Sequence, residues 1–184
     1  WHDVRPRVVP GSHPGSKAFV VEGRATCVQP TRIDQRASVA HSVGSLLGYM
    51  ERGQAQDLVS SWAAAVTNRD AVLRDGWNAR IDWAGKSQVP VLDVITQDYM
   101  PTVEAALRRR RIDLERLDAV HQRVSARQTG SDASQMFVRA ARRAGWDWPS
   151  QRERLIQWYL ENAEADLPVA TWELPVDLRR FSES

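Results

Sequence analysis

The clearest pattern in the chain is a run of apolar residues three or four positions apart, which is the spacing of one face of an α-helix. The run consists of Val39, Val43, Leu46, Leu47 and Met50. Thr31 followed three residues later by Asp34 forms a capping pattern before the run, and Gly53 is a natural stop after it. The sequence therefore predicts a helix between Thr31 and Gly53.

Similar patterns predict further helices along most of the chain. They lie around residues 58–66, 69–83, 113–124, 134–144 and 151–162. Asp75-Gly76 interrupts the second of these, Asp113 can cap the third, and Ser150 with Glu153 forms a capping box before the last. Pro90 and Pro101 divide the stretch between the second and third helices.

Both ends of the chain favour β-structure instead. Ala18–Val21 and Ala25–Val28 are β-type runs on either side of Glu22-Gly23, which predicts a hairpin or two short strands. Val169 to Leu178 alternates and predicts a strand near the C-terminus. We therefore expect a mostly helical α+β chain, divided by the Gly/Ser-containing stretch that begins at Thr129 into units of residues 1–128 and 129–184.

Composition narrows the class of protein. The chain is 42% hydrophobic and 26% charged, which suits a folded domain and predicts no membrane partner. Cys27 is the only cysteine, which fits a reducing compartment and indicates the cytoplasm. Lysine occurs only at Lys17 and Lys86, and the net charge of +2 is small, so a nucleic-acid partner is not favoured.

Gly85-Lys86-Ser87 is the ending of a phosphate-binding P-loop, but the rest of that motif is absent. The loop needs a glycine five residues before Gly85, where Arg80 stands, and no apolar strand leads into it. The four histidines show no metal-ligand spacing either. We therefore expect neither a P-loop nor a metal site formed by this chain alone.

Two features leave alternatives open. Trp172, in the predicted C-terminal strand, is either a core residue or a flat surface on which a nucleobase stacks. The arginine run Arg108–Arg111 is either a solvated helix end, where cations suit the helix dipole, or a contact for nucleic acid.

Several short motifs, taken in chain order, resemble one enzyme family. They are His2-Asp3-Val4, Gly23-Arg24, Ile33-x-Gln35-Arg36, Trp62 followed by Ile81-Asp82-Trp83-x-x-Lys86, Leu117-Asp118-x-x-His121, Pro149 with Arg152 and Arg154, and Ala170-Thr171-Trp172. This series resembles the C-terminal part of the Pup ligase / Pup deamidase (depupylase) family. The Ile81–Lys86 motif is the most specific, and we interpret it as a structural helix.

The chain departs from the family pattern at several of these motifs. Glu22 replaces the first glycine of a double glycine, Val120 and Gln122 replace the tyrosine and aspartate around His121, and Ile156-Gln157 replaces an Arg-Gly pair. The resemblance therefore indicates a divergent member.

The resemblance implies a fold and a reaction. Residues 1–128 would form the C-terminal part of a glutamine-synthetase/γ-glutamyl-cysteine-ligase-like catalytic domain, and residues 129–184 a small C-terminal domain. The enzyme would be an ATP-dependent carboxylate–amine ligase or deamidase/isopeptidase that acts on the C-terminal Glu or Gln of a ubiquitin-like, Pup-like protein. Its catalytic residues and Mg²⁺ ligands would lie in an N-terminal portion of the same enzyme, so that this chain alone would not catalyse the reaction.

By the same resemblance, four residues of this chain would contact ATP. Trp172 would hold the adenine, Arg154 or Arg152 would hold a phosphate or have a structural role, and Arg24 would face the nucleotide or substrate cradle. The expected partners are the N-terminal portion and the ubiquitin-like substrate. The alternative function is a stand-alone helical, arginine-rich module that binds nucleic acid or protein.

Overall fold

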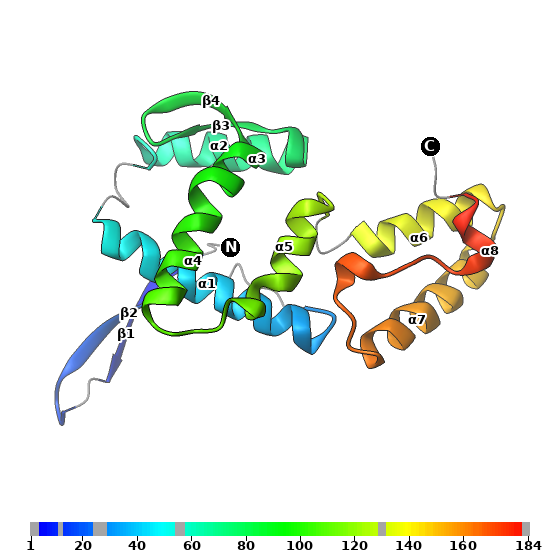
Figure 1. Ribbon diagram of the computed structural model, residues 1–184, viewed down its shortest axis with the longest axis horizontal. Coiled ribbons are helices and arrows are strands. Elements are labelled where there is room, and N and C mark those ends of the chain that lie inside the picture. The colour runs from blue at the N-terminus through cyan, green and yellow to red at the C-terminus, as the bar shows by residue number, and fades with distance from the viewer. Residues whose placement is uncertain (1–3, 11–12, 24–28, 54–57, 129–131, 182–184) are drawn as a thin grey trace.

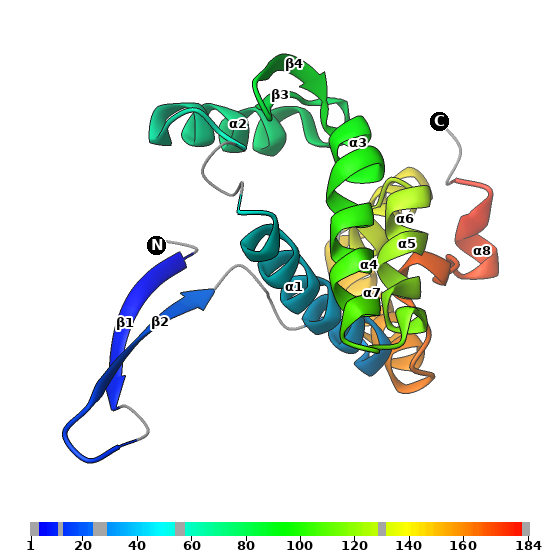
Figure 2. The ribbon, with the colours of Figure 1, turned by 60° about the vertical axis from the view of Figure 1, so that its left-hand side comes forward.

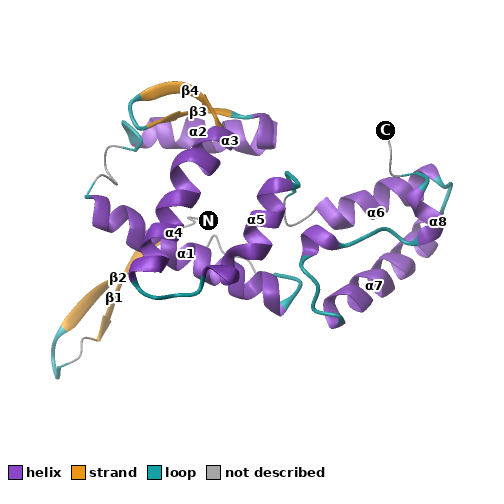
Figure 3. Cartoon of the chain, in the orientation of Figure 1, coloured by secondary structure: helices purple, strands orange, loops and turns teal. Residues whose placement is uncertain are grey.

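The computed structural model describes residues 4–10, 13–23, 29–53, 58–128 and 132–181, which form a mostly helical α+β structure (Figures 1 and 3). The strands form two antiparallel pairs, β1 (Val4–Pro10) with β2 (Lys17–Gly23) and β3 (Arg80–Trp83) with β4 (Lys86–Pro90). The helices are α1 (Arg32–Arg52), α2 (Trp62–Asp75), α3 (Val91–Val94), α4 (Met100–Arg109), α5 (Asp118–Ser125), α6 (Asp132–Arg143), α7 (Trp148–Glu164) and α8 (Val176–Arg179). Short 3₁₀ segments lie at Gly76–Asn78, Leu114–Leu117 and Val169–Thr171, and a π-helical turn at Ile95–Tyr99 joins α3 to α4. No helix in these ranges is both long enough and apolar enough to cross a membrane.

Helix α1 begins and ends as the sequence predicts, and it packs closely across α4. The Thr31 side chain accepts a hydrogen bond from the backbone N–H of Asp34, and Gly53 ends the helix in the left-handed conformation. A Cβ atom at Gly44 would lie 2.7 Å from Val103 Cγ1, and one at Gly48 would lie 2.9 Å from the carbonyl oxygen of Thr102. The two helices therefore approach as closely as they do because both positions lack a side chain.

The apolar residues that predict α1 are mostly not the ones that it buries. The buried side chains and glycines of the helix are Asp34, Ala37, Ala40, Gly44, Gly48 and Tyr49. On another face, four large apolar side chains remain exposed by 40–67%: Val39, Val43, Leu46 and Met50. We call these four residues the α1 stripe. The described residues leave the stripe largely uncovered.

The first hairpin differs from its prediction in its turn. Glu22 and Gly23 are not the turn, because they lie inside β2, opposite Arg5 and Val4. The connection between the strands falls between Pro10 and Lys17 instead. Ala25–Val28 lies outside the described residues. In both ribbon views the hairpin projects away from the helices (Figure 2).

The Ile81–Lys86 motif is a hairpin rather than the helix that we expected. Ala84 and Gly85 have φ values of 50° and 76°, and they connect Trp83 to its partner Lys86 as a two-residue turn of the kind that requires positive φ. Asn68 of α2 pairs with both backbone groups of Asp82, since its Oδ1 accepts from the Asp82 N–H at 2.9 Å and its Nδ2 donates to the Asp82 carbonyl at 2.7 Å. In place of the predicted helices over 58–66 and 69–83 there is one helix, α2, which ends at Asp75 with Gly76 as its C-cap.

Asp98, in the π-helical turn, connects this hairpin to α1. Its carboxylate accepts hydrogen bonds from Trp83 Nε1 at 2.7 Å and from Arg52 at 2.5 Å. Burial acts to raise the pKa of Asp98, but these two donors and the Arg52 charge outweigh burial and hold the pKa below its usual value. The charged form of Asp98 therefore stabilises this junction.

The C-terminal helices have a core of their own. Its buried side chains all lie after residue 132: Ala133, Phe137, Ala140, Ala141, Trp158, Val169, Trp172, Leu174 and Leu178. Helices α6 and α7 match the predicted pair, although α7 begins after Asp147, which caps it in place of Ser150. We call residues 132–181 the C-terminal unit. The predicted division into units of 1–128 and 129–184 stays a prediction.

The predicted strand over Val169–Leu178 is wrong. The segment is a 3₁₀ turn, a short extended stretch and then α8. Pro168 precedes the turn and Pro175 precedes α8, and both helical pieces begin at the next residue. The alternation that suggested a strand arises because Trp172 and Leu174, two residues apart in the extended stretch, both enter the core.

We predict that Gly48→Ala destabilises the protein by about 1–3 kcal/mol, since overpacking costs that much where the neighbour cannot move. Alanine would otherwise favour a helix by up to about 1 kcal/mol over glycine. A Cβ at Gly48 would lie 2.7 Å from Thr102 Cγ2 and 2.9 Å from the Thr102 carbonyl oxygen, and a side-chain rotation can relieve only the first of these contacts. Urea unfolding of the two proteins measures the difference.

Leu46→Ala is the matched control, because Leu46 lies on the same helix and is 58% exposed. We expect it to change the free energy of unfolding by no more than about 0.5 kcal/mol. A Gly48→Ala protein as stable as the wild type would show that α1 and α4 are not closely packed.

Candidate functional site

A groove of about 570 Å³ runs between α1 and the segment that follows α4. Its lining residues are Gln35, Arg36, Val39, Ala40, Val43, Leu107, Arg111, Ile112, Asp113 and Arg116. We call it the α1–α4 groove. Half of the α1 stripe, Val39 and Val43, contributes to its floor, and Leu46 and Met50 extend the apolar surface along α1 beyond it.

Three exposed arginines surround this apolar floor: Arg36, Arg111 and Arg116. None of them forms an ion pair with another residue in the part of the chain that the structure describes. The one acid in the lining, Asp113, already accepts a hydrogen bond from the backbone N–H of Glu115 at 3.0 Å. As far as the described residues show, the groove thus combines apolar surface with positive charge that has no ion-pair partner.

The rest of the arginine run pairs with nearby acids. Arg108 pairs with Glu104 at 3.1 Å, and Arg109 and Arg110 both pair with Glu51 at the end of α1. The run does lie at the end of a helix, as expected. Only Arg111 lines the groove, from a left-handed backbone conformation with φ of 57°.

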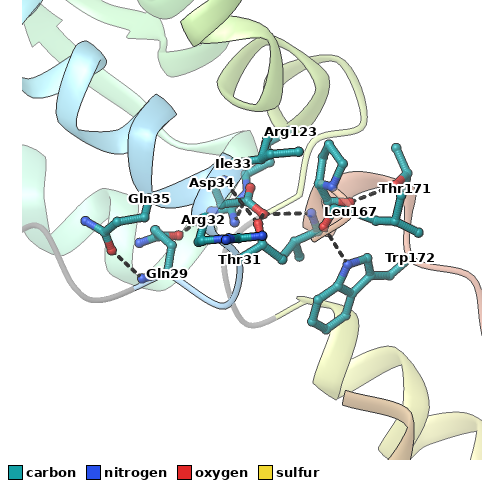
Figure 4. A network of polar contacts seen from close by, with 12 residues as sticks. Gln29, Thr31, Arg32, Ile33, Asp34, Gln35, Arg123, Leu167, Thr171 and Trp172 are labelled. Carbon is teal, nitrogen blue, oxygen red and sulfur yellow. Dashed lines mark hydrogen bonds and ion pairs between the residues drawn. The ribbon is translucent and has the colours of Figure 1, made fainter. Parts of the chain in front are cut away.

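The first turn of α1, next to the groove, is where the C-terminal unit attaches (Figure 4). The Asp34 carboxylate is buried, and it accepts hydrogen bonds from Thr31 Oγ1 at 2.6 Å and from the backbone N–H of Val169 at 2.9 Å. It also pairs with Arg123 of α5 at 2.8 Å. Asp34 therefore joins three segments that are far apart in the sequence.

A second carboxylate makes the reverse connection. Asp166, after α7, accepts from the backbone N–H groups of Arg32 and Ile33 at 2.8 and 3.3 Å, and from Arg32 Nε at 3.2 Å. Partial burial acts to raise the pKa of Asp166, but these donors and the Arg32 charge outweigh it and hold the pKa below its usual value. We call Asp34, Asp166 and their partners the α1 clasp.

Side-chain amides extend the clasp to the groove. The carboxamide oxygen of Gln35, a groove residue, accepts from the backbone N–H of Gln29 at 2.9 Å. The Gln29 carboxamide oxygen in turn accepts from Arg123 at 2.8 Å. A continuous set of contacts therefore runs from Gln35 through Arg123 and Asp34 to Val169.

The structure describes three of the residues expected to contact ATP, Trp172, Arg154 and Arg152, and shows what surrounds each of them. Trp172 is 5% exposed, its indole N–H donates to the Leu167 carbonyl at 3.0 Å, and its ring meets Trp158 and Tyr159 edge to face. Of the two alternatives left open by the sequence, this placement favours a core residue over a stacking surface.

The two described arginines of this set have other surroundings. Arg154 pairs with Asp177 at 3.0 Å, and its guanidinium lies 4.9 Å from the centre of the Trp146 ring. Arg152 lies exposed on α7, and Arg24 is outside the described residues. Within the described ranges, no cluster of three or more His, Cys, Asp or Glu residues is placed to hold a metal ion.

Comparison with protein-family models, with curated proteins and with solved structures finds no match for this chain. The assignment of a function therefore depends on the chain's own geometry and on the motif resemblance.

The sequence indicated several residues of the groove but not the groove itself. The Ile33-x-Gln35-Arg36 motif supplied Gln35 and Arg36, and the apolar pattern supplied Val39 and Val43. Arg111 was singled out only as part of the arginine run, and Arg116 was not singled out. A signal was present in α1. Its small residues Ala40, Gly44 and Gly48 recur every four positions, which marks the face that packs closely and leaves the larger apolar residues for another partner.

We predict that the stabilising contribution of Asp166 is lost in acid. Because its folded pKa is lowered, this contribution is fully present above its unfolded pKa near 4 and disappears as the pH falls through the folded value. Asp166→Asn should therefore be less stable than the wild type at pH 7, and the difference should shrink by pH 3. Urea midpoints at the two pH values measure it. An equal difference between the urea midpoints of the two proteins at both pH values would contradict the lowered pKa of Asp166.

Proposed function

We propose that this chain is the protein-binding, C-terminal portion of an ATP-dependent ligase or deamidase/isopeptidase that acts on a ubiquitin-like protein. Its own contribution is the α1–α4 groove, which binds a segment of that protein that is apolar on one side and acidic on the other. The observation that carries the proposal is the combination of an open apolar floor with three arginines that form no ion pair within the described ranges.

The apolar surface has the dimensions of a helix-binding site. From Val39 to Met50 the α1 stripe covers eleven residue steps, or about 16 Å at 1.5 Å per residue. A bound helix of about three turns would match that length and present side chains three or four residues apart to it. A continuous row of exposed apolar side chains along one helix face commonly marks a docking site.

The arginines determine the charge of the segment. Guanidinium groups bind carboxylates with two parallel hydrogen bonds, so Arg36, Arg111 and Arg116 favour glutamates and aspartates beside the apolar contacts. Nucleic acid fits less well, because Arg108, Arg109 and Arg110 are already paired with Glu104 and Glu51. The protein-binding form of the alternative function is thus the one that the geometry supports.

One observation favours the enzymatic part of the proposal. The Ile33-x-Gln35-Arg36 motif, which contributes to the family resemblance, contributes Gln35 and Arg36 to the groove. In this proposal the glutamine-synthetase-like catalytic centre, with ATP and Mg²⁺, is completed by an N-terminal portion of the enzyme. The groove would hold the ubiquitin-like substrate while its C-terminal Glu or Gln reaches that centre.

The groove is tested with a synthetic peptide of about 16 residues, long enough for the stripe, that carries leucines every three or four positions and glutamates between them. We expect Val43→Asp to weaken its binding at least about tenfold, since an unpaired carboxylate would face the apolar side of the peptide. Isothermal titration calorimetry measures the affinity.

Two controls accompany this test. Leu73→Asp places the same charge on α2, at a residue that is 71% exposed and outside the groove lining, and should leave the affinity unchanged. A peptide with lysines in place of the glutamates should bind far more weakly. Equal binding of both peptides, or no effect of Val43→Asp, would refute the groove as the site.

The enzymatic part needs a separate experiment. The protein is combined with the N-terminal portion that the proposal requires and is supplied with Mg-ATP and a ubiquitin-like protein that ends in Glu or Gln. We expect ATP hydrolysis or release of ammonia that depends on that protein, and Val43→Asp should raise the KM for it. If neither product forms while the groove still binds the acidic peptide, the chain is a binding module and not part of such an enzyme.

A further inference from the structure

We propose that the α1 clasp is a conformational link, by which attachment of the C-terminal unit to α1 holds the groove in its binding form. The inference concerns regulation of the site described above and rests on the proposed function. Asp34 and Asp166 are positioning residues here, since neither belongs to the groove lining.

The clasp and the groove share the start of one helix. Asp166 accepts hydrogen bonds from the backbone N–H groups of Arg32 and Ile33, and Asp34 accepts one from the N–H of Val169. The next two residues, Gln35 and Arg36, already line the groove. Whatever orders the first turn of α1 therefore also orders one end of the groove.

The first turn of a helix depends on outside partners, because its leading N–H groups have no acceptor within the helix. The Thr31 side chain provides an acceptor for the N–H of Asp34. The N–H groups of Arg32 and Ile33 find their acceptor in Asp166, which is 133 or more residues away in the sequence. When the C-terminal unit is released, those two groups lose their acceptor. Helix ends are where local opening begins, so the released state should have a frayed turn at Gln35 and Arg36.

Arg123 provides a second route between the same two places. Its side chain is 17% exposed, and it pairs with Asp34 while it donates to Gln29, whose N–H is held by Gln35. Detachment of Val169 leaves Asp34 with one donor fewer and allows Arg123 to shift. The orientation of the Gln35 side chain in the groove depends on that arrangement.

Two states follow, one attached with an ordered groove and one released with a frayed groove. A peptide that binds only the ordered groove must favour the attached state, and coupling of this kind is reciprocal. Binding in the groove should therefore protect the N–H of Val169, which lies in the C-terminal unit and is bonded to Asp34.

Asp166 allows a sharp test, because its conservative variant keeps the essential contact. Asp166 has a φ of 53°, a conformation that asparagine tolerates, and asparagine also accepts hydrogen bonds from helix N–H groups. We expect Asp166→Ala to weaken binding of the acidic peptide about three- to tenfold, the loss that corresponds to one helix cap. Asp166→Asn should retain most of the affinity.

Asp177→Asn is the matched control, since it removes a surface ion pair with Arg154 inside the C-terminal unit. Its affinity for the peptide should equal that of the wild type. Amide hydrogen exchange is recorded for every variant, with and without peptide. We expect faster exchange at Gln35 and Arg36 in Asp166→Ala, and slower exchange at Val169 when the peptide binds the wild type.

The outcomes separate the two proposals. If Val43→Asp abolishes binding but Asp166→Ala binds as the wild type does, the groove is confirmed as the site and the link is wrong. If the peptide leaves exchange at Val169 unchanged, the link is also wrong, because a purely structural clasp would behave in that way. If the peptide does not bind at all, the groove proposal fails. Unchanged amide exchange at Gln35 and Arg36 in Asp166→Ala would by itself overturn the link.

Discussion

The close contact of α1 with α4 is the constraint on which the rest of the structure depends. Gly44 and Gly48 let the two backbones meet at Val103 and Thr102, and this fixes which face of α1 is buried. The same contact turns the larger apolar residues of α1 outward and places them beside the end of α4, where the arginines lie. The groove is therefore a product of two glycines that are not part of it.

Local chemistry explains which parts of the fold the sequence could predict. The caps at Thr31, Gly53 and Asp113 act over a few residues, and the structure confirms all three. The hairpin at Ile81–Lys86 was missed, because the Ala84-Gly85 turn and the contact of Asp82 with Asn68 involve backbone conformation and a residue fourteen positions away. Alternation near the C-terminus was misinterpreted for a similar reason, since side chains can enter a core alternately from an extended segment that has no partner strand.

The candidate site shows the same division between local and distant information. Arg36 could be named from a motif, but the role of Arg111 depends on its distance from α1, which no local pattern encodes. The resemblance named Arg154 and Trp172 as ATP contacts. Only the structure of the C-terminal unit shows that Arg154 forms an ion pair and that Trp172 belongs to a core. The charge of the groove could not be predicted from the sequence, because it depends on which arginines of the run pair with Glu51 and Glu104 in the structure.

The contact between Asn68 and Asp82 has a consequence for how this protein can meet others. A two-stranded sheet normally offers its outer N–H and C=O groups to any extended chain that approaches its edge. On β3 the carboxamide of Asn68 already occupies both groups of Asp82, as an added strand would. The β3–β4 hairpin is thereby protected at that point against pairing with a foreign strand.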